Sequence, residues 1–315
     1  MSTTPARSVL LMAHGAAESP GELEGYYTHV RGRPPPPALL AELTERYRAI
    51  GGRSPLRAIT ASLATRLQAE LDRRKNPGTY RVTYGFRHTP PFLEDVVTAL
   101  LADGTTDLLC IVLAPHFSRF VDRGYRGPVE TAVARSGAPA NFRILESWYR
   151  EPSFVALEAD RVREALTRLR PTAWTTTRVC FTAHSLPESM LSGNDPYPDE
   201  LRDGARAIAQ QAGIPSDAFL TAWQSAGRTE DRWLGPDLRD VLRALRAQGI
   251  DSVVVCAHGF VSDHLEILYD IDIEARSVAD SLGLRLERAA MPNDDPRFAQ
   301  ALADVIDRSE RPFGR

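Results

Sequence analysis

The stretch that decides the fold is Val253–Ala275, with the sequence VVVCAHGFVSDHLEILYDIDIEA. It opens with the apolar run Val253–Cys256, which is short and rich in β-branched residues and therefore predicts a buried strand. A His–Gly pair interrupts the run, and Ser262 or Asp263 can then cap a helix that we expect to continue to about Ser277. A strand followed by a helix is the basic unit of an α/β fold.

Four acidic residues of the expected helix recur at spacings of three and four, which places them on one helical face: Asp263, Glu266, Asp270 and Glu274. Like charges at this spacing destabilise a helix by roughly 0.2–0.5 kcal/mol per pair. A solvated face is the ordinary explanation for such a stripe, but here the opposite face is apolar and is expected to pack on a core. The stripe also begins just after a strand ends, where open α/β sheets bind ligands. We therefore expect these carboxylates to attract a cation.

The composition is that of an ordinary soluble protein. The chain has 315 residues, of which 43% are hydrophobic and 25% charged, enough for two domains with a sizeable core. A formal net charge of -3 does not favour a nucleic acid or an anionic membrane as partner. The first residues, MSTTPARSVLLMAHG, carry too short an apolar run for a secretory signal, and no stretch approaches the ~18 apolar residues of a membrane helix. We expect a cytoplasmic protein without a membrane anchor.

Three cysteines lie in separate apolar, strand-like runs: Cys110, Cys180 and Cys256. None belongs to a CxxC pair, so a disulfide framework, a zinc finger and an iron–sulfur cluster are not expected. The sequence also lacks a GxSxG elbow, a Walker or GxGxxG loop and an HExxH motif. We therefore expect small buried thiols and no resident cofactor.

Strand-like and helix-like patterns alternate along the chain, which predicts parallel sheets covered by helices on both faces. The halves resemble each other, because Ala13–His14 and Glu18–Ser19 recur as Ala183–His184 and Glu188–Ser189, at a constant offset. The predicted fold is α/β, with two similar Rossmann-like lobes and a cleft between them. We place the two lobes, with the last helix able to pack back on the first, at residues 1–171 and 172–315.

Four of the seven histidines fall at or just past the end of an apolar strand run: His14, His116, His184 and His258. A single such histidine is more often structural, but parallel strand ends converge, so we expect one or two of the four to touch substrate. His184 is the strongest candidate, because imidazole titrates near neutral pH and binds divalent metals when neutral. Glu266 is its expected counterpart across the cleft. The pair fits proton abstraction combined with metal delivery.

A series of segments that runs in order through nearly the whole chain resembles ferrochelatases, the enzymes that insert ferrous iron into a porphyrin: THVRGRPPPP, ERYRAIGGRSPL, APHFS, ESWYREPSF, FTAHSLPES, GNDPYPDEL, WQSAGRTEDRWLGPD, HGFVSDHLEILYDIDIEA and AMPNDDP. The resemblance is greatest to the soluble, monomeric branch of Gram-positive bacteria that uses coproporphyrin. The AHSLP and SDHLE…YDIDIE motifs are its most specific parts.

The resemblance implies two four-stranded parallel sheets flanked by helices, with a bent porphyrin in the cleft between the lobes. By position it implies that His184 and Glu266 are the catalytic and metal-binding pair. It also implies that Asp270 and Glu274 continue outward as an acidic relay for iron or protons. Contacts to the porphyrin carboxylates are implied at Arg31, Arg46, Ser54, Ser118 and Tyr125.

Two positions depart from this branch. His14 stands where the branch has a tyrosine, on the side of the metal opposite the catalytic histidine. Because a neutral imidazole is a better ligand for Fe2+ than a phenol, we predict that His14 contacts the porphyrin and ligates the iron of bound product. Arg87 replaces the usual lysine in a segment implied to hold metal or a propionate. The chain lacks the cluster-binding cysteines of some relatives.

We therefore expect a monomer that inserts Fe2+ into coproporphyrin III to give coproheme, with no cofactor beyond the substrate iron. Two other functions stay open. One is a cobalt or nickel chelatase acting on sirohydrochlorin, a class that favours two histidines. The other is a porphyrin or heme carrier without catalysis. A carrier would not need a row of acidic residues that relays iron or protons. The mechanism depends on His184 and Glu266 facing each other across a gap.

Overall fold

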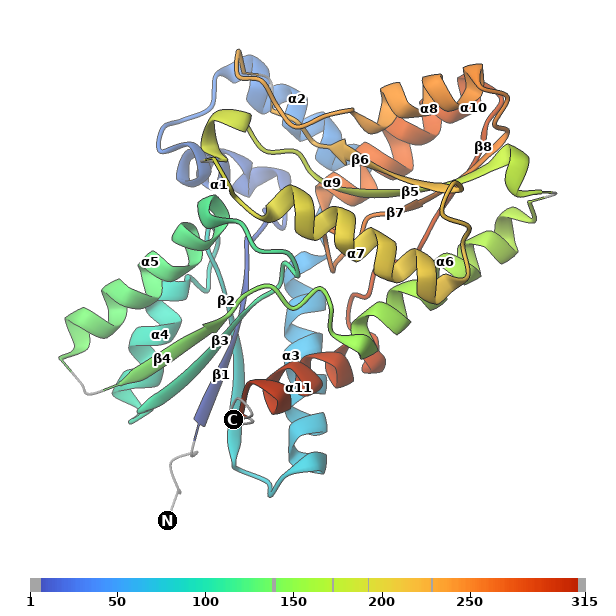
Figure 1. Ribbon diagram of the computed structural model, residues 1–315. Helices are drawn as coiled ribbons and strands as arrows, with labels where there is room; N and C mark the ends of the chain where they lie inside the picture. Colours follow the sequence, from blue (N-terminus) through green and yellow to red (C-terminus); the bar gives the residue numbers. More distant parts are fainter. Residues whose placement is uncertain (1–6, 138–139, 172, 192, 228, 311–315) are drawn as a thin grey trace.

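The computed structural model describes residues 7–137, 140–171, 173–191, 193–227 and 229–310, which form two α/β lobes (Figure 1). Each lobe contains one four-stranded parallel sheet, in the order β2-β1-β3-β4 in the first and β6-β5-β7-β8 in the second. The strands are β1 (Arg7–Ala13), β2 (Tyr80–Phe86), β3 (Asp107–Val112), β4 (Asn141–Leu145), β5 (Thr177–His184), β6 (Phe219–Gln224), β7 (Ser252–Cys256) and β8 (Arg285–Arg288). The predicted fold class is confirmed.

The second sheet repeats the topology of the first, strand for strand. β1 and β5 hold equivalent central positions, each paired with two parallel neighbours. The sequence repeat at His14 and His184 therefore marks the ends of equivalent strands. Because all four strands of each sheet run the same way, their carboxyl ends lie along one edge.

Helices cover both faces of the sheets, which explains why the central strands are continuous apolar runs. Val9, Leu10, Leu11 and Met12 of β1 are completely buried, as are Val253, Val254 and Val255 of β7. The helices of the first half are η1 (Pro20–Glu22), α1 (Leu23–Arg31), α2 (Pro37–Ala49), α3 (Leu56–Arg74), α4 (Leu93–Ala102), α5 (Arg119–Ser136) and α6 (Pro152–Leu169). Those of the second half are η2 (Trp174–Thr176), η3 (Glu188–Met190), α7 (Tyr197–Ala212), α8 (Leu238–Ala247), α9 (Leu265–Leu268), η4 (Asp270–Ala275), α10 (Arg276–Ser281) and α11 (Pro296–Glu310).

The helix after β7 differs from the prediction. It begins at Leu265, beyond Ser262 and Asp263, and it is divided into α9, the π-helical turn η4 and α10. The π turn is visible in the bond from the Glu274 N–H to the Tyr269 carbonyl, five residues back. The expectation of one regular α-helix from Ser262 or Asp263 to about Ser277 is therefore wrong. π-turns within helices occur frequently at functional sites.

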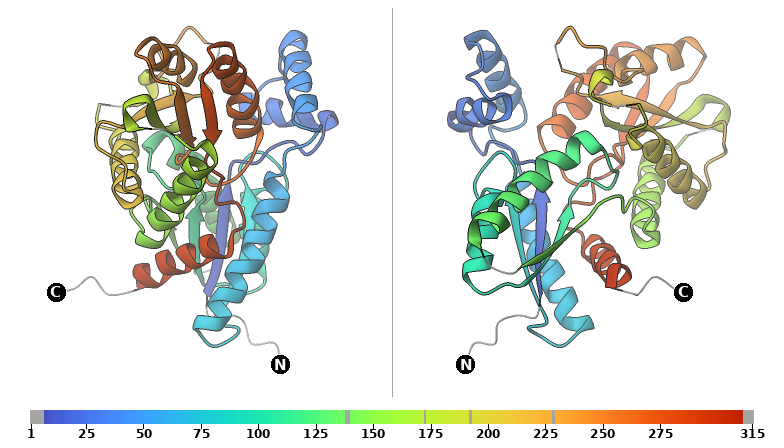
Figure 2. Two further views of the ribbon diagram at one scale, coloured as in Figure 1. Left: turned by 90° about the vertical axis from the view of Figure 1, so that its right-hand side faces the viewer. Right: turned by 60° about the vertical axis from the view of Figure 1, so that its left-hand side comes forward.

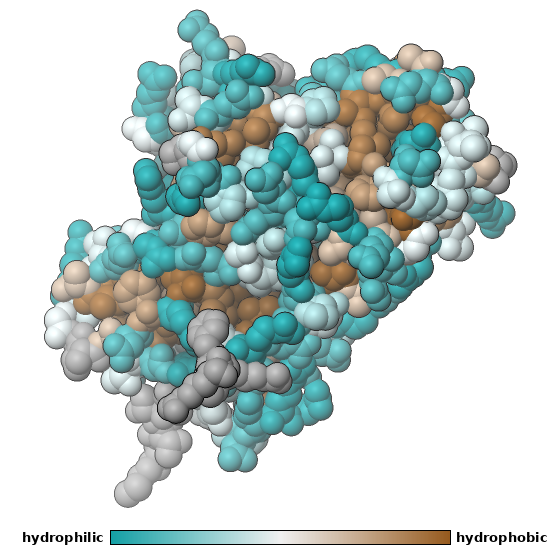
Figure 3. Space-filling view, in the orientation of Figure 1, coloured by the Kyte–Doolittle hydropathy of each residue, from teal (hydrophilic) through white to brown (hydrophobic). Residues whose placement is uncertain are grey.

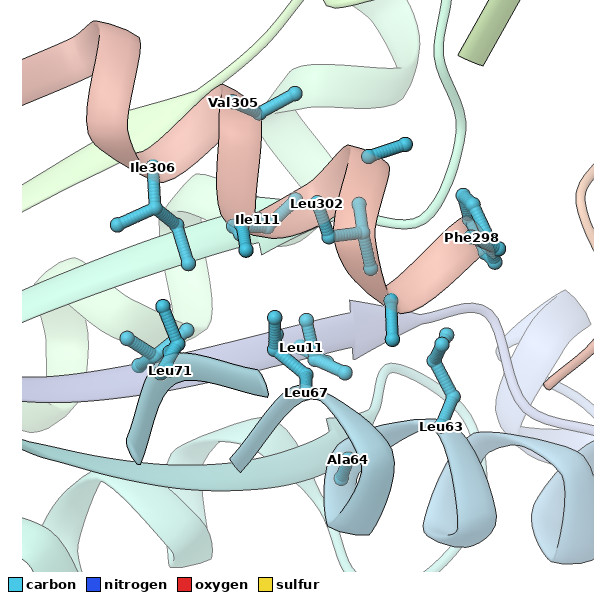
Figure 4. Packing of buried hydrophobic residues seen from close by; sticks show 14 of the residues in the cluster. Leu11, Leu63, Ala64, Leu67, Leu71, Ile111, Phe298, Leu302, Val305 and Ile306 are labelled. Carbon is cyan, nitrogen blue, oxygen red and sulfur yellow. The ribbon is translucent and has the colours of Figure 1, made fainter. Parts of the chain in front are cut away.

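The last helix packs back on the first lobe. Figure 4 shows Leu302 and Ile306 of α11 facing α3. On α3 they face Leu67 and Leu71, and Leu11 of β1 belongs to the same cluster. Conversely, α6 packs against the second sheet, although the sequence analysis assigned it to the first lobe, which ends at residue 171. The packing of α11 on the first lobe is as expected, whereas the packing of α6 on the second sheet was not anticipated. The two helices together connect the lobes, and the boundary between residues 171 and 172 stays a prediction.

Helices α1 and α2 extend from the first lobe and lie beside the second lobe in both views of Figure 2. Leu23 of α1 and Tyr47 of α2 pack with Leu265 of α9. On the face shown in Figure 3, polar and charged side chains cover much of the surface, and hydrophobic side chains gather near β3 and β4. Within the part of the chain that the structure describes, every helix is too short or too polar to cross a membrane.

Candidate functional site

A cavity of about 300 Å³ lies between the lobes, where the strand ends of both sheets meet. This volume is at the lower end of the about 300–1,000 Å³ that is usual for small-molecule sites. Residues that follow β1, β5 and β7 line it, and aromatic side chains from the helices contribute much of the remaining wall: Tyr26, Tyr27, Phe120, Tyr125 and Tyr197. The cavity is thus a largely aromatic slot with a few polar groups.

His184 and Glu266 meet in this cavity. His184 ends β5, and Glu266 lies in α9, which follows β7. His184 Nε2 and Glu266 Oε2 are 3.6 Å apart, with 32% and 34% of the two side chains exposed. The other ring nitrogen of His184, Nδ1, donates to the Ser185 carbonyl oxygen, so a neutral His184 carries its lone pair on Nε2. The structure therefore places the two predicted side chains face to face, as the prediction requires.

His264, which the sequence reasoning did not single out, approaches the same carboxylate. Its Nε2 is also 3.6 Å from Glu266 Oε2, while its Nδ1 donates to the Ser262 carbonyl oxygen at 2.9 Å. When both imidazoles are neutral, two lone pairs thus face one carboxylate, and a proton or a cation between them relieves the repulsion. The sequence signal was weak, because a histidine two positions before Glu266 shares no helical face with it. The extended backbone of His264, with φ -159° and ψ -174°, brings it there.

The charges of this group are coupled. Burial alone would raise the pKa of Glu266, but the charges of His184 and then His264 outweigh burial and lower it to about 2. Burial opposes a charge on His264, yet its contact with Glu266 more than offsets burial and the pKa of His264 is raised. Glu266 is therefore an ionised carboxylate that stabilises positive charge on its neighbours.

Asp270 and Glu274 continue from Glu266 into a neighbouring pocket that Arg46 also lines. Arg46 Nη1 is 3.5 Å from Asp270 Oδ1, and its Nη2 is 3.7 Å from Glu274 Oε1. The Ser225 hydroxyl donates to Asp270 Oδ2 at 2.5 Å. Burial, assisted by the charge of Glu266, raises the pKa of Asp270 to about 6. Asp270 can therefore exchange protons close to neutral pH.

Asp263 does not belong to this row. Its Oδ1 is 3.2 Å from Arg288 Nη1, and its Oδ2 accepts a 2.7 Å bond from the Asn293 side chain. The expectation that four carboxylates share one face is wrong for Asp263, because the helix starts after it and turns it toward β8. Three carboxylates remain in the row.

His14 lines the cavity on the side of the first lobe. Its Nδ1 is 3.3 Å from the Gly15 carbonyl oxygen and 3.2 Å from the Tyr26 hydroxyl. Since a carbonyl oxygen only accepts, Nδ1 carries the proton and Nε2 keeps its lone pair. His14 is exposed to the cavity, yet desolvation by the surrounding protein lowers its pKa to about 4. The charge of Glu266 and the bond to the Gly15 carbonyl oxygen oppose this shift, and the charge of Arg87 adds to it. His14 is therefore a neutral imidazole.

The other two strand-end histidines are buried. His116 and His258 are 4% and 1% exposed, and their rings meet edge to face at 5.0 Å. His258 Nε2 is 3.0 Å from the Leu201 carbonyl oxygen. Only His116 of this pair lines the cavity, among the described residues. Two of the four strand-end histidines thus present a ring nitrogen beside polar cavity groups, and the other two mainly fill the space between the lobes.

The residues implied to hold porphyrin carboxylates are spread over several places. Tyr125 lines the cavity, but Arg31 is exposed at the end of α1. Ser54 is buried, and its Oγ accepts a 3.4 Å bond from the Leu56 N–H. Ser118 is buried at the N-cap of α5, where it bonds to Asp195 Oδ2 at 3.2 Å. Their binding roles stay predictions.

The sequence reasoning did not find the tyrosines of α1 and α7 that line the cavity, Tyr26, Tyr27 and Tyr197. The sequence offered little signal for them, because an adjacent pair of aromatic residues such as Tyr26–Tyr27 fits an ordinary buried helix face equally well. In the part of the chain that the structure describes, no three His, Cys, Asp or Glu side chains are arranged to hold a metal ion by themselves.

Comparison with known proteins identifies the family. The ferrochelatase family model matches residues 6–310. The chain is 43% identical over 300 residues to the coproporphyrin III ferrochelatase of Anoxybacillus flavithermus, covering 95% of this chain and 94% of the relative. It is 41% identical over 300 residues to that of Bacillus subtilis, covering 95% and 96%. The sirohydrochlorin chelatase SirB from Bacillus subtilis subspecies spizizenii, solved with cobalt, shares the fold, with a TM-score of 0.53 over 97% of this chain and 96% of that one at 11% identity. This chain belongs to the ferrochelatase family.

Proposed function

We propose that the protein inserts Fe2+ into coproporphyrin III and releases coproheme and two protons. Support comes from the relatives, which carry the name coproporphyrin III ferrochelatase over nearly the whole length of the chain. The observation that carries the proposal is the Glu266 carboxylate between His184 Nε2 and His264 Nε2, each 3.6 Å away, in the wall of an aromatic cavity. This group can take protons from a flat macrocycle.

The proposed reaction needs a base, because two pyrrole N–H bonds must break before all four ring nitrogens can bind the iron. His184 Nε2 is the acceptor, since its Nδ1 is occupied by the Ser185 carbonyl oxygen. Glu266 stays ionised and stabilises the imidazolium that results. Asp270, with a pKa of about 6, takes the proton onward toward the pocket that Glu274 lines. Such a positioned base contributes about 10²–10⁴-fold to a rate.

His14 approaches the substrate from the other lobe in this proposal. Its neutral Nε2 is a suitable axial ligand for the iron of the product, because a borderline ion such as Fe2+ binds imidazole well. Fe2+ is a substrate here, and the proposal includes no resident cofactor.

We further propose that the protein acts as a monomer in the cytoplasm. One chain supplies both walls of the cavity, so a second copy is not needed to complete the site. Free cysteines are typical of proteins in a reducing compartment. Sedimentation of the purified protein measures its oligomeric state, and a stable dimer would contradict the first part.

An anaerobic assay tests the proposed reaction. Wild-type protein is mixed with Fe2+ or Co2+ and with coproporphyrin III, protoporphyrin IX or sirohydrochlorin, and insertion is followed by absorption. We expect the highest kcat/KM for Fe2+ with coproporphyrin III. Faster reaction of Co2+ with sirohydrochlorin would support the alternative chelatase, which the two histidines around Glu266 favour. Binding of porphyrin without any insertion would support the carrier.

A further inference from the structure

Arg87 occupies an unusual place in the cavity. It is the first residue after β2, and its backbone N–H donates to the Ala13 carbonyl oxygen at 2.9 Å, which fixes the end of β2 against the end of β1. Of the residues in the described ranges that line the cavity, Arg87 alone is a lysine or arginine. The wall of the cavity therefore carries a single permanent positive charge, beside His14 and Tyr125.

The guanidinium of Arg87 has no partner among the residues that the structure describes. No hydrogen bond or ion pair joins it to another residue in the described part of the chain. Neighbouring arginines differ, because Arg46 pairs with Asp270 and Glu274, and Arg57 is 2.8 Å from Glu18. A half-buried charge without a counter-ion is unfavourable, and an anion brought in by a ligand removes that cost.

The helix that faces Arg87 is shaped to receive it. A Cβ atom on Gly124 of α5 would lie 2.0 Å from Arg87 Cζ and 2.1 Å from its Nη1. Any side chain at residue 124 would therefore displace the guanidinium from this position. Glycine inside a helix is less favourable than alanine, so α5 gives up helical stability at the residue where the guanidinium lies.

The Tyr125 hydroxyl is a second group that can bind a carboxylate near the Arg87 guanidinium. Tyr125, the residue after Gly124, lines the same cavity and is 5% exposed. Arg87 lies against Gly124, the residue directly before Tyr125, and both Arg87 and Tyr125 line the cavity. A guanidinium fork and a hydroxyl are the donors that a carboxylate prefers.

We propose that Arg87 is an anchor for one carboxylate of the porphyrin, held by Gly124 and assisted by the Tyr125 hydroxyl. This inference rests on the proposed function, because coproporphyrin III supplies the carboxylates. It assigns a specificity role to a residue whose charge the protein leaves unpaired. The planar fork of arginine can bind both carboxylate oxygens, which the single ammonium of a lysine cannot do in the same way.

Binding measurements test the anchor without any metal. The Kd of metal-free coproporphyrin III and of its tetramethyl ester is measured by fluorescence, in one detergent-containing buffer, for wild type and variants. We expect Arg87→Gln to raise the Kd of the free acid roughly ten- to a hundredfold, the usual worth of a charge-assisted bond, and to leave the Kd of the ester nearly unchanged.

Gly124→Ala provides an independent variant, because it keeps the guanidinium but displaces it. We expect Gly124→Ala to raise the Kd for the free acid, although alanine favours the helix. We expect Arg87→Lys to retain part of the affinity for the free acid. Arg123→Gln is the matched control, since Arg123 is exposed on the same helix and loses the same charge. Its Kd should equal that of wild type. Circular dichroism establishes that each variant is folded.

Three outcomes would overturn the inference. The first is an unchanged Kd of the free acid in folded Arg87→Gln. The second is an equal loss of affinity for acid and ester. The third is a change in iron insertion with unchanged porphyrin binding, which would assign Arg87 to the metal. In each case wild type still metallates coproporphyrin III, whereas a wild type that fails to do so would overturn the proposed function instead.

Discussion

His14 and His184 hold equivalent positions in the two lobes, yet the groups that they contact directly differ. His184 faces the Glu266 carboxylate at 3.6 Å, and the acidic row continues to Asp270. His14 lies beside Arg87 and packs on His88, with ring centroids 4.5 Å apart. The duplicated fold thus supplies one imidazole to each side of the cavity, and the neighbours of each imidazole decide its chemistry.

The physical reason is electrostatic. A carboxylate stabilises imidazolium, so His184 is suited to accept a proton from the substrate. Desolvation by the surrounding protein makes a charge on His14 costly and lowers its pKa to about 4, although the charge of Glu266 acts in the opposite direction. A neutral nitrogen lone pair is what a metal ligand requires. One side of the cavity is therefore suited to remove protons and the other to hold metal.

Removing the base should have the largest effect. We expect His184→Ala to lower kcat for Fe2+ insertion by about 10²–10⁴-fold, the usual contribution of a positioned base. Its Kd for coproporphyrin III should stay close to that of wild type, because His184 is not a carboxylate anchor. An anaerobic absorption assay with a parallel fluorescence titration measures both. Full activity in His184→Ala would show that His184 is not the proton acceptor, and the proposed difference in role between His184 and His14 would then be wrong.

Neutralising the acidic side is the next largest change. Glu266→Gln removes the charge that stabilises two imidazoles, and we expect kcat to fall about 10–100-fold, from the worth of hydrogen bonds to charged groups. Without Glu266 the burial of His264 is no longer offset, so the pKa of His264 should drop below its ordinary value. NMR titration of the His264 ring follows this. A His264 pKa that stays raised would show that another group controls it.

Asp270 allows the acidic row to be tested through stability. Its pKa of about 6 lies above the ordinary value, so its contribution to folding is present at low pH and is lost as pH rises through 6. Asp270→Asn does not titrate, so its free energy of unfolding should rise relative to wild type by about 1–2 kcal/mol between pH 4 and pH 8. Urea denaturation at several pH values measures this slope. A parallel pH dependence in both proteins would mean that Asp270 has an ordinary pKa.

His14→Ala should have the smallest effect on the insertion rate. The variant keeps His184 and Glu266, so the proton steps should proceed within a few-fold of wild type. The absorption spectrum of the bound product should change, because the iron loses an axial nitrogen ligand. His14→Tyr restores the residue implied for related enzymes and serves as the matched variant. An unchanged product spectrum in His14→Ala would contradict the ligand role.

The sequence by itself determined the two parallel sheets and the location of the site. Apolar runs such as Val253–Cys256 could be recognised because strands buried on both faces must be apolar throughout. The offset repeat identified His14 and His184 as equivalent strand ends. Glu266 was found from its spacing along one segment and its place after a strand. These features are local, because each depends on the order of residues along the chain.

Only the tertiary structure decided which of these side chains meet. Periodicity says that a residue faces a core or a cleft, but it does not say which distant residue it touches. The extended backbone at His264, the turn of Asp263 toward Arg288 and the return of α11 to the first lobe all come from packing between elements. The unpaired charge of Arg87 has the same origin, because whether a guanidinium has a partner depends on every element packed around it.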